Sequence, residues 1–123
     1  MAKAVGVGGI FLKSNDPQVL ATWYATHLGI TGLDKTSLVF DGPEAGGMTV
    51  FSHFPQNTAY FGDGQQSFML NFRVDNLDQL LADLAAAGVN IDPKREDHPY
   101  GRFAWISDPE GNRVELWEAV PEA

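Results

Sequence analysis

Residues 100–118 read YGRFAWISDPEGNRVELWE, and this stretch decides the fold. Apolar and polar residues alternate on both sides of Asp108-Pro109-Glu110-Gly111, which is typical of two antiparallel strands joined by a turn. A four-residue turn pairs Ser107 with Asn112, and directly opposed residues point to the same side of a sheet. One face is then expected to carry Arg102, Ala104, Ile106, Arg113, Glu115 and Trp117. The other face, expected to pack under a helix, carries Phe103, Trp105, Val114 and Leu116.

Two segments upstream have the spacing and the end signals of helices. The first begins at Asp16-Pro17, a capping carboxylate before a proline, and is expected to end at Gly29. Its expected buried face consists of Leu20, Trp23, Tyr24, His27 and Leu28. The second begins at Asp75 or Asn76 and is expected to end at Gly88. Its expected buried face consists of Leu77, Leu80, Leu81 and Leu84.

Strand-like runs surround the two helices in the same order, which predicts an internal duplication of a strand–helix–strands unit. The runs of the first copy are 9–13, 36–41 and 48–54, and those of the second are 68–74, 100–107 and 112–118. This order predicts an α+β fold. We expect a single domain over residues 1–123, with one module over about 5–54, a connector over 55–66 and a second module over about 67–120.

Composition excludes several classes of protein. The chain has 123 residues, no cysteine and a formal net charge of −8. The missing cysteines exclude disulfide scaffolds and thiol nucleophiles, and the negative charge disfavours nucleic acid and anionic lipid as partners. No apolar run approaches the ~20 residues of a membrane helix, so we expect no membrane partner. The first residues lack the apolar core of a signal peptide, so a cytoplasmic location is expected.

The closing stretch, with its DPEGNxxEL core, resembles the last hairpin of the vicinal oxygen chelate superfamily. That superfamily includes glyoxalase I, bleomycin and fosfomycin resistance proteins, and extradiol dioxygenases. The paired modules, and Trp23-Tyr24 before Leu28-Gly29-Ile30, resemble it as well, so that the similarity runs from about Gly6 to Ala119. The resemblance implies two tandem βαβββ modules that form a curved, cup-like mixed sheet with the helices outside. It also implies a homodimer.

The resemblance further implies four metal-ligand positions, one on each central strand of the cup. They fall at Gly9 or a neighbour, near Thr49, at Met69 and at Glu115. A catalytic divalent metal needs about three protein ligands, and glycine and methionine offer no hard oxygen or imidazole donor. We therefore predict no metal and no cofactor, and expect a protein that binds a small organic molecule in its cup.

The candidate site follows from the face assigned to the cup. Glu115 is the candidate catalytic residue, as a carboxylate positioned for acid–base chemistry; an ion pair with Arg102 or Arg113 is the structural alternative. The candidate ligand-binding residues are Thr49, Phe51, His53, Met69, Asn71, Tyr100, Arg102 and Trp117. Because this set holds both an arginine and a glutamate, it predicts a neutral or zwitterionic ligand with an aromatic part.

Two alternatives remain open. One is a divalent-metal-dependent lyase or isomerase of the glyoxalase type, which requires His53 to meet Glu115 and a third ligand from His98 or a partner subunit. The other is a cup filled by its own side chains in a protein that acts through a protein partner. A pocket below about 300 Å³ would favour that alternative.

Overall fold

The computed structural model describes residues 2–40, 48–62 and 65–120. Its elements follow one order twice, a strand, a helix and three strands. The first half comprises β1 (Ala4–Ser14), α1 (Pro17–Leu28), β2 (Thr31–Gly32), β3 (Ser37–Phe40) and β4 (Thr49–Pro55). The second half comprises β5 (Phe68–Val74), α2 (Leu77–Ala86), β6 (Ile91–His98), β7 (Gly101–Ser107) and β8 (Arg113–Ala119). The predicted duplication is thus confirmed; the expected end of the second strand at Asp41 lies outside the described residues.

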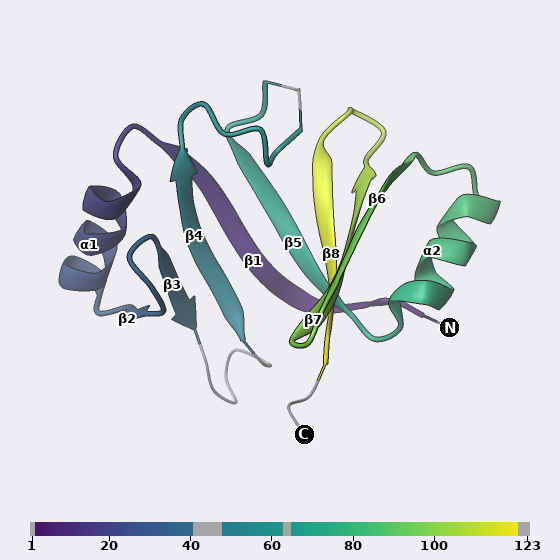
Figure 1. Cartoon of the computed structure of the whole chain (residues 1–123), viewed down its shortest axis with the longest axis horizontal. Coiled ribbons are helices and arrows are strands. Elements are labelled where there is room, and N and C mark those ends of the chain that lie inside the picture. The colour runs from purple at the N-terminus through teal and green to yellow at the C-terminus, as the bar shows by residue number, and fades with distance from the viewer. Residues whose placement is uncertain (1, 41–47, 63–64, 121–123) are drawn as a thin grey trace.

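All eight strands form one mixed sheet in the order β2-β3-β4-β1-β5-β8-β7-β6. The first strand of each half pairs in parallel with the last strand of the same half, and the halves meet where β1 pairs antiparallel with β5. The sheet is strongly curved, and the two helices lie at opposite ends of it (Figure 1). This is the expected α+β architecture of two tandem βαβββ modules with a cup-like mixed sheet.

Two clusters of buried side chains occupy the two faces of this sheet. One lies on the concave side and consists of Phe11, Phe61, Met69 and Trp105. The other lies beneath α2 and consists of Val74, Leu77, Ala104 and Leu116, with further leucines of the helix packed against it. Trp105, which was expected under a helix, therefore lies on the cup side of β7.

The closing hairpin differs from its predicted register by one residue. Ser107 pairs with Arg113, so Asp108–Asn112 forms a five-residue loop rather than a four-residue turn. The Asp108 carboxylate stabilises this longer loop by accepting hydrogen bonds from the backbone N–H groups of Glu110 and Asn112, both at 2.9 Å. A shift of one residue between paired strands reverses the faces of one strand relative to the other. In the structure Trp105 opposes Glu115, and Phe103 opposes Trp117.

The helices begin where the sequence predicts. Asp16 caps α1 and accepts a hydrogen bond from Val19 N at 3.2 Å, and Gly29 ends the helix in the left-handed conformation. Asn76, the second of two candidates, caps α2. The predicted inner face of α1 is confirmed in part: Leu20 and Tyr24 are half-buried, whereas Trp23, His27 and Leu28 are exposed and the buried residue of this helix is Ala21.

Two strands were missed by the sequence analysis, and both lie at edges of the sheet. β2 has only two residues. β6 reads IDPKREDH, and its charged residues hide the usual alternation of a strand. None of the helices in the described part of the chain is long and apolar enough to span a membrane.

Candidate ligand pocket

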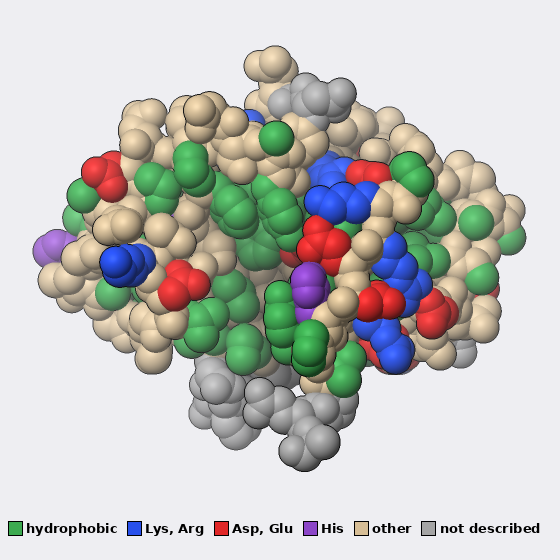
Figure 2. Space-filling view, viewed as in Figure 1, with side chains coloured by type: hydrophobic (Ala, Val, Ile, Leu, Met, Phe, Trp, Pro, Cys, Tyr) green, Lys and Arg blue, Asp and Glu red, His purple; other side chains and the backbone are tan. Residues whose placement is uncertain are grey.

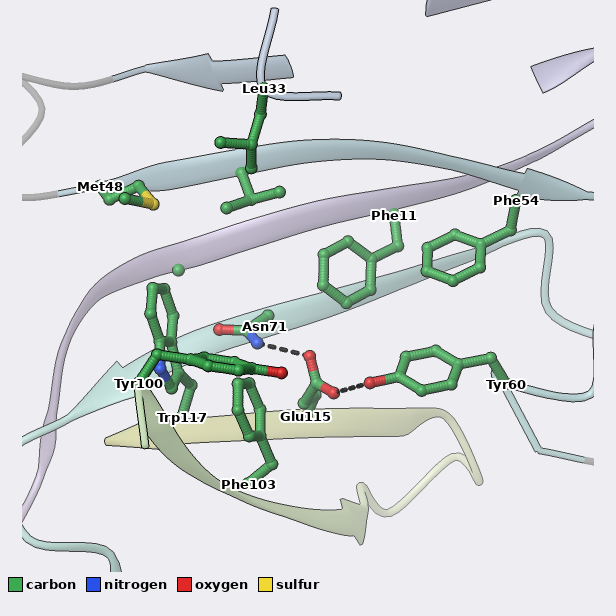
Figure 3. A pocket seen from close by; sticks show the side chains of 12 residues that line it. Phe11, Leu33, Met48, Phe54, Tyr60, Asn71, Tyr100, Phe103, Glu115 and Trp117 are labelled. Atoms are coloured by element: carbon green, nitrogen blue, oxygen red, sulfur yellow. Dashed lines mark hydrogen bonds between the residues drawn. The ribbon is translucent and has the colours of Figure 1, made fainter. Parts of the chain in front are cut away.

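A pocket of about 260 Å³ opens on the concave side of the sheet. It is lined by Gly8, Phe11, Leu33, Met48, Val50, Phe54, Tyr60, Asn71, Tyr100, Phe103, Glu115 and Trp117. Most of these side chains are apolar or aromatic, and they come from both halves of the chain (Figure 3). On the surface, hydrophobic side chains gather over the centre of this face, whereas Lys, Arg, Asp and Glu gather on the side of β6 (Figure 2).

Glu115 is the only charged side chain among these lining residues, and it is 1% exposed. Its two carboxylate oxygens accept different hydrogen bonds. Tyr60 Oη donates to Oε1, and Asn71 Nδ2 donates to Oε2 at 2.6 Å. Tyr60 comes from the connector between the halves, and Asn71 pairs with Glu115 across β5 and β8. The carboxylate is thus held in place from two separate segments (Figure 3).

Burial governs the ionisation of this pair. Desolvation raises the pKa of the Glu115 carboxyl above its usual 4.5, and the hydrogen bonds from Tyr60 and Asn71 oppose that rise. Burial, followed by the nearby charge of Glu115, also raises the pKa of the Tyr60 hydroxyl far above 10. Tyr60 therefore keeps its proton at physiological pH and acts as a hydrogen-bond donor to the carboxylate.

Two glycines make room for Trp117. A Cβ atom at Gly8 would lie 2.9 Å from Trp117 Cε3 and 2.1 Å from Asn71 Oδ1. A Cβ atom at Gly101 would lie 2.3 Å from Trp117 Nε1. The indole fits between these two backbones and stacks on Phe103, with ring centroids 6.0 Å apart and planes at 4°. Gly8 thus determines the position of both Trp117 and Asn71.

Four of the predicted site residues lie together around this pocket: Asn71, Tyr100, Glu115 and Trp117. Met69 also faces the cup, but it is completely buried beside Phe11 and Trp105 and does not line the pocket. Their roles in binding remain predictions. What the structure establishes is that β5, β8 and the turn between β6 and β7 bring these four side chains to one cavity.

Three predicted residues on β4 lie on the opposite face of that strand. Phe51 and His53 contact the ring of Tyr24 on α1, with centroids 4.8 and 5.6 Å apart, and Thr49 Oγ1 donates to the carbonyl of Val7 at 2.8 Å. The residues of β4 that line the pocket are Val50 and Phe54. The predicted face was wrong because this strand is apolar on both sides, so its alternation does not reveal which side is inner.

Arg102 is also displaced from its predicted place. The one-residue shift of the hairpin turns it to the outer face, where its guanidinium donates to Glu118 Oε2 at 3.0 Å. The same shift brings Phe103 into the pocket wall. The alternative ion pair of Glu115 with Arg102 or Arg113 is likewise wrong, because Arg113 pairs with Asp92 at 2.6 Å.

Sequence reasoning missed several lining residues, and Tyr60 matters most among them. It lies in the connector, where no periodic pattern marks one side chain over another. Phe11 could have been found, because the alternation of 9–13 places it on the same face as Gly9. Leu33 lies outside the expected strands, and Met48 begins the expected run 48–54 on the face opposite to the one that was assigned to the cup.

The residues at the implied metal positions do not fit a divalent cation. Of these positions Glu115 alone brings a carboxylate to the cup, because Gly8 and Val50 hold the inner places on β1 and β4, and Met69 on β5 is completely buried in the concave cluster. Asn71 directs its NH₂ group, a donor, toward that carboxylate. His53 lies behind β4, and His98 Nε2 pairs with Glu96 at 3.0 Å, so neither meets Glu115. The described residues contain no cluster of three His, Cys, Asp or Glu side chains with metal-binding geometry.

Comparison with known proteins gives one family and a group of similar folds. The model of the Glyoxalase/Bleomycin resistance protein/Dioxygenase superfamily matches residues 6–116. No curated protein sequence matches the chain.

Solved structures with this fold cover nearly the whole chain. A Streptomyces coelicolor methylmalonyl-CoA epimerase in complex with 2-nitronate-propionyl-CoA has a TM-score of 0.73 at 14% identity, over 97% of this chain and 100% of the epimerase. A methylmalonyl-CoA epimerase from Mycobacterium tuberculosis has a TM-score of 0.68 at 19% identity, over 96% and 90% of the two chains. A superfamily member from Vibrio splendidus 12B01 has a TM-score of 0.57 at 11% identity, over 96% and 99%. At these identities the likeness concerns the fold alone.

Proposed function

This chain belongs to the Glyoxalase/Bleomycin resistance protein/Dioxygenase superfamily, and from that premise we propose that it binds a small organic molecule in the pocket, without a metal, with Glu115 as the polar anchor. One observation carries the proposal: the carboxylate of Glu115, which is 1% exposed, lies in a cavity whose other lining side chains, apart from Asn71, are apolar or aromatic. Cavities of this composition, with a few convergent polar groups, are typical ligand sites.

The energetics of burial support a role in recognition. Removing a carboxylate from water costs several kcal/mol, and well-packed apolar residues usually serve stability as well or better. A carboxylate has about four lone-pair sites. Tyr60 and Asn71 occupy two of them, so Glu115 keeps acceptor capacity toward the cavity. Two further buried atoms of the lining residues, Asn71 Oδ1 and Trp117 Nε1, have no hydrogen-bond partner among the described residues.

The volume of the pocket limits the size of the ligand. About 260 Å³ lies just below the ~300 Å³ lower end of drug-sized sites, in the range that favours the self-filled cup of the sequence analysis. It exceeds the ~150 Å³ of an apolar cavity that admits benzene. The buried carboxylate argues against a cup that serves packing only. A molecule built around one ring fits this volume.

A coenzyme A ester, as in the S. coelicolor epimerase complex, suits this pocket poorly. Phosphate groups are bound by Lys, Arg or backbone N–H groups at a helix N-terminus. None of the residues that line the described pocket is Lys, Arg or His, and the net charge of the chain is −8. We therefore propose a ligand without phosphate.

The test is a binding screen with a matched pair of variants. Single-ring fragments are added to the protein, and binding is followed by the change in tryptophan fluorescence and in melting temperature. Glu115→Gln should weaken those fragments that carry a hydrogen-bond donor or a positive charge, whereas Glu110→Gln, which changes an exposed carboxylate in the adjacent loop, should not. The proposal is wrong if no fragment changes the tryptophan fluorescence or the melting temperature. It is also wrong if both variants bind the fragments as the unmodified protein does.

Metal-free proton transfer on the bound molecule is a second candidate function. The hydrogen bond from Tyr60 to Glu115 favours it, because it joins a potential base to a proton donor in a water-poor site. A fragment found in the screen can be incubated in D₂O and followed by NMR. Deuterium exchange at carbon that is lost in Glu115→Gln supports turnover, and unchanged fragment spectra contradict it.

We also propose a homodimer, formed through the outer face of the central strands. Ile10 and Phe68 are exposed on this face, and their neighbours Leu12 and Leu70 pair with them across β1 and β5. Contiguous exposed apolar surface of this kind marks association sites. Phe68→Asp should yield a monomer in analytical ultracentrifugation, whereas Leu28→Asp on α1, which changes a residue that is also exposed, should not. A monomeric unmodified protein at all concentrations contradicts the proposal.

A further inference from the structure

We infer that the pocket is selective for a small organic cation, a quaternary or protonated amine attached to an aromatic or branched apolar group. This inference rests on the proposed function, since it concerns the same pocket. It replaces the expected neutral or zwitterionic ligand, because that expectation depended on Arg102 being in the cup.

Aromatic rings surround Glu115 on two sides (Figure 3). On one side Phe54 and Tyr60 are stacked, with centroids 5.2 Å apart and planes at 10°, and Phe11 lies 5.4 Å from Phe54. On the other side Phe103 and Trp117 are stacked and Tyr100 forms the outer wall. The faces of such rings carry partial negative charge and attract cations within about 6 Å, which is how aromatic cages recognise quaternary ammonium groups.

The carboxylate adds a full negative charge to this aromatic surface. A ligand that enters the cavity exchanges water for aromatic faces and for the free lone pairs of Glu115. An ammonium group gains from both contacts, whereas an uncharged group of the same shape gains chiefly from apolar burial. An anion is repelled both by the aromatic faces and by the carboxylate of Glu115, and the repulsion is strong because the site lacks water.

Positive side chains near the pocket are already engaged elsewhere. Arg73 lies on the cup side of β5, but its guanidinium donates to the carbonyl oxygens of Val7 and Met48. Arg113 pairs with Asp92, and Lys94 pairs with Glu96 at 3.0 Å. Arg102 lies on the outer face with Glu118. The described lining therefore contains no cation of its own that would compete with the ligand for Glu115.

The charge of the whole chain acts in the same direction. A net charge of −8 attracts cations toward the surface and repels anions, with an effect on association that weakens as salt is added. The selectivity inferred here should survive added salt better than this long-range attraction, because the contacts within the pocket are short and screened little.

Three probes of nearly equal size separate charge from shape. They are benzyltrimethylammonium, its uncharged carbon isostere neopentylbenzene, and phenylacetate. Binding of each is measured by saturation-transfer NMR and by tryptophan fluorescence at low and at physiological salt. We expect the cation to bind about tenfold or more tightly than the isostere, and phenylacetate to bind most weakly.

The variants then locate the source of the preference. Glu115→Gln should reduce the preference for the cation to a few-fold while the isostere binds as before. Trp117→Leu, added to Glu115→Gln, should reduce this remaining preference further. Glu110→Gln serves as the control and should leave the preference unchanged. Equal binding of cation and isostere, or stronger binding of phenylacetate, overturns this inference and leaves the proposed pocket intact. Failure of all three probes, together with an empty fragment screen, overturns the proposed function itself.

Discussion

The first half of the molecule, β1 to β4, and the second half, β5 to β8, repeat one element order around a single pocket, yet they supply side chains of different kinds. The first half contributes glycine and apolar groups, among them Gly8, Phe11 and Val50. The second half contributes Asn71, Glu115 and three of the six lining aromatic rings, those of Tyr100, Phe103 and Trp117. The comparison indicates that one copy of the unit supplies space and the other supplies polar recognition.

The helices of the two halves differ in how many apolar side chains they bury. α2 packs Leu77, which is completely buried, and three further leucines onto the sheet. α1 buries only Ala21 among its residues, all of which the structure describes. The second half therefore holds more of the apolar contacts that stabilise the fold, in addition to the polar part of the pocket.

The largest expected effect compares a tryptophan from each half. Trp105→Ala removes a completely buried side chain from the concave cluster and should lower the free energy of unfolding by about 3–5 kcal/mol. Trp23→Ala removes a side chain that is 50% exposed and should change it by less than about 1 kcal/mol. Urea denaturation measures both. Equal losses would show that the apolar contacts are shared evenly between the halves.

A second comparison tests whether the first half acts by leaving space. Gly8→Ala brings a methyl group against Asn71 Oδ1 and Trp117, and should destabilise the protein by about 1–3 kcal/mol and weaken fragment binding. Gly32→Ala, where a Cβ atom would meet nothing within 4 Å, is the control. Thermal unfolding and the fragment screen provide the measurements. If Gly8→Ala were neutral in both, the indole would not depend on this glycine.

The buried carboxylate of the second half should leave a signature in the pH dependence of stability. Because the pKa of Glu115 is raised from 4.5 in the folded state, the folded chain binds more protons than the unfolded chain between those two values. Protonation of Glu115 therefore contributes fully to the free energy of unfolding below pH 4.5. This contribution is lost as the pH rises through the raised pKa. Glu115→Gln should lack this fall.

Denaturation midpoints of Glu115→Gln and of unmodified protein, measured from pH 4 to 9, isolate this contribution from that of other groups. Asp92 and Glu96 have pKa values lowered by Arg113 and His98 respectively, and they act in the opposite direction in both proteins. Parallel pH profiles of the two proteins would mean that Glu115 titrates as in the unfolded chain.

The smallest expected effect concerns Arg102. Its ion pair with Glu118 is partly exposed, so Arg102→Ala should change stability by about 0–1 kcal/mol and leave fragment binding unchanged. The fragment screen provides the check. A marked loss of binding would return Arg102 to the site, as the sequence analysis proposed.

The duplication was predictable because its signals are local. Asp16 and Asn76 cap their helices with their own side chains, and Pro17 and Gly29 act through their backbone conformations alone. The superfamily resemblance through residues 100–118 likewise depends on a contiguous stretch of sequence. These features need no knowledge of tertiary contacts.

Much of the pocket was not predictable for equally physical reasons. The register of the last hairpin depends on whether its loop has four or five residues. The longer loop is stabilised by hydrogen bonds to the carboxylate of Asp108. β4 has apolar residues on both faces, so Val50 and Phe51 compete for the inner position. Tyr60 reaches Glu115 across 55 positions of sequence from a segment without periodicity.

The two ends of the sheet have a practical consequence for engineering. One end is the two-residue β2. The other is β6, which carries Pro93, then four consecutive charged residues from Lys94 to Asp97, and then His98. Neither offers a long neutral backbone edge for another chain to extend. The sheet therefore presents little template for fibril growth, which favours the fold as a scaffold whose cup-facing positions are randomised to obtain small-molecule sensors.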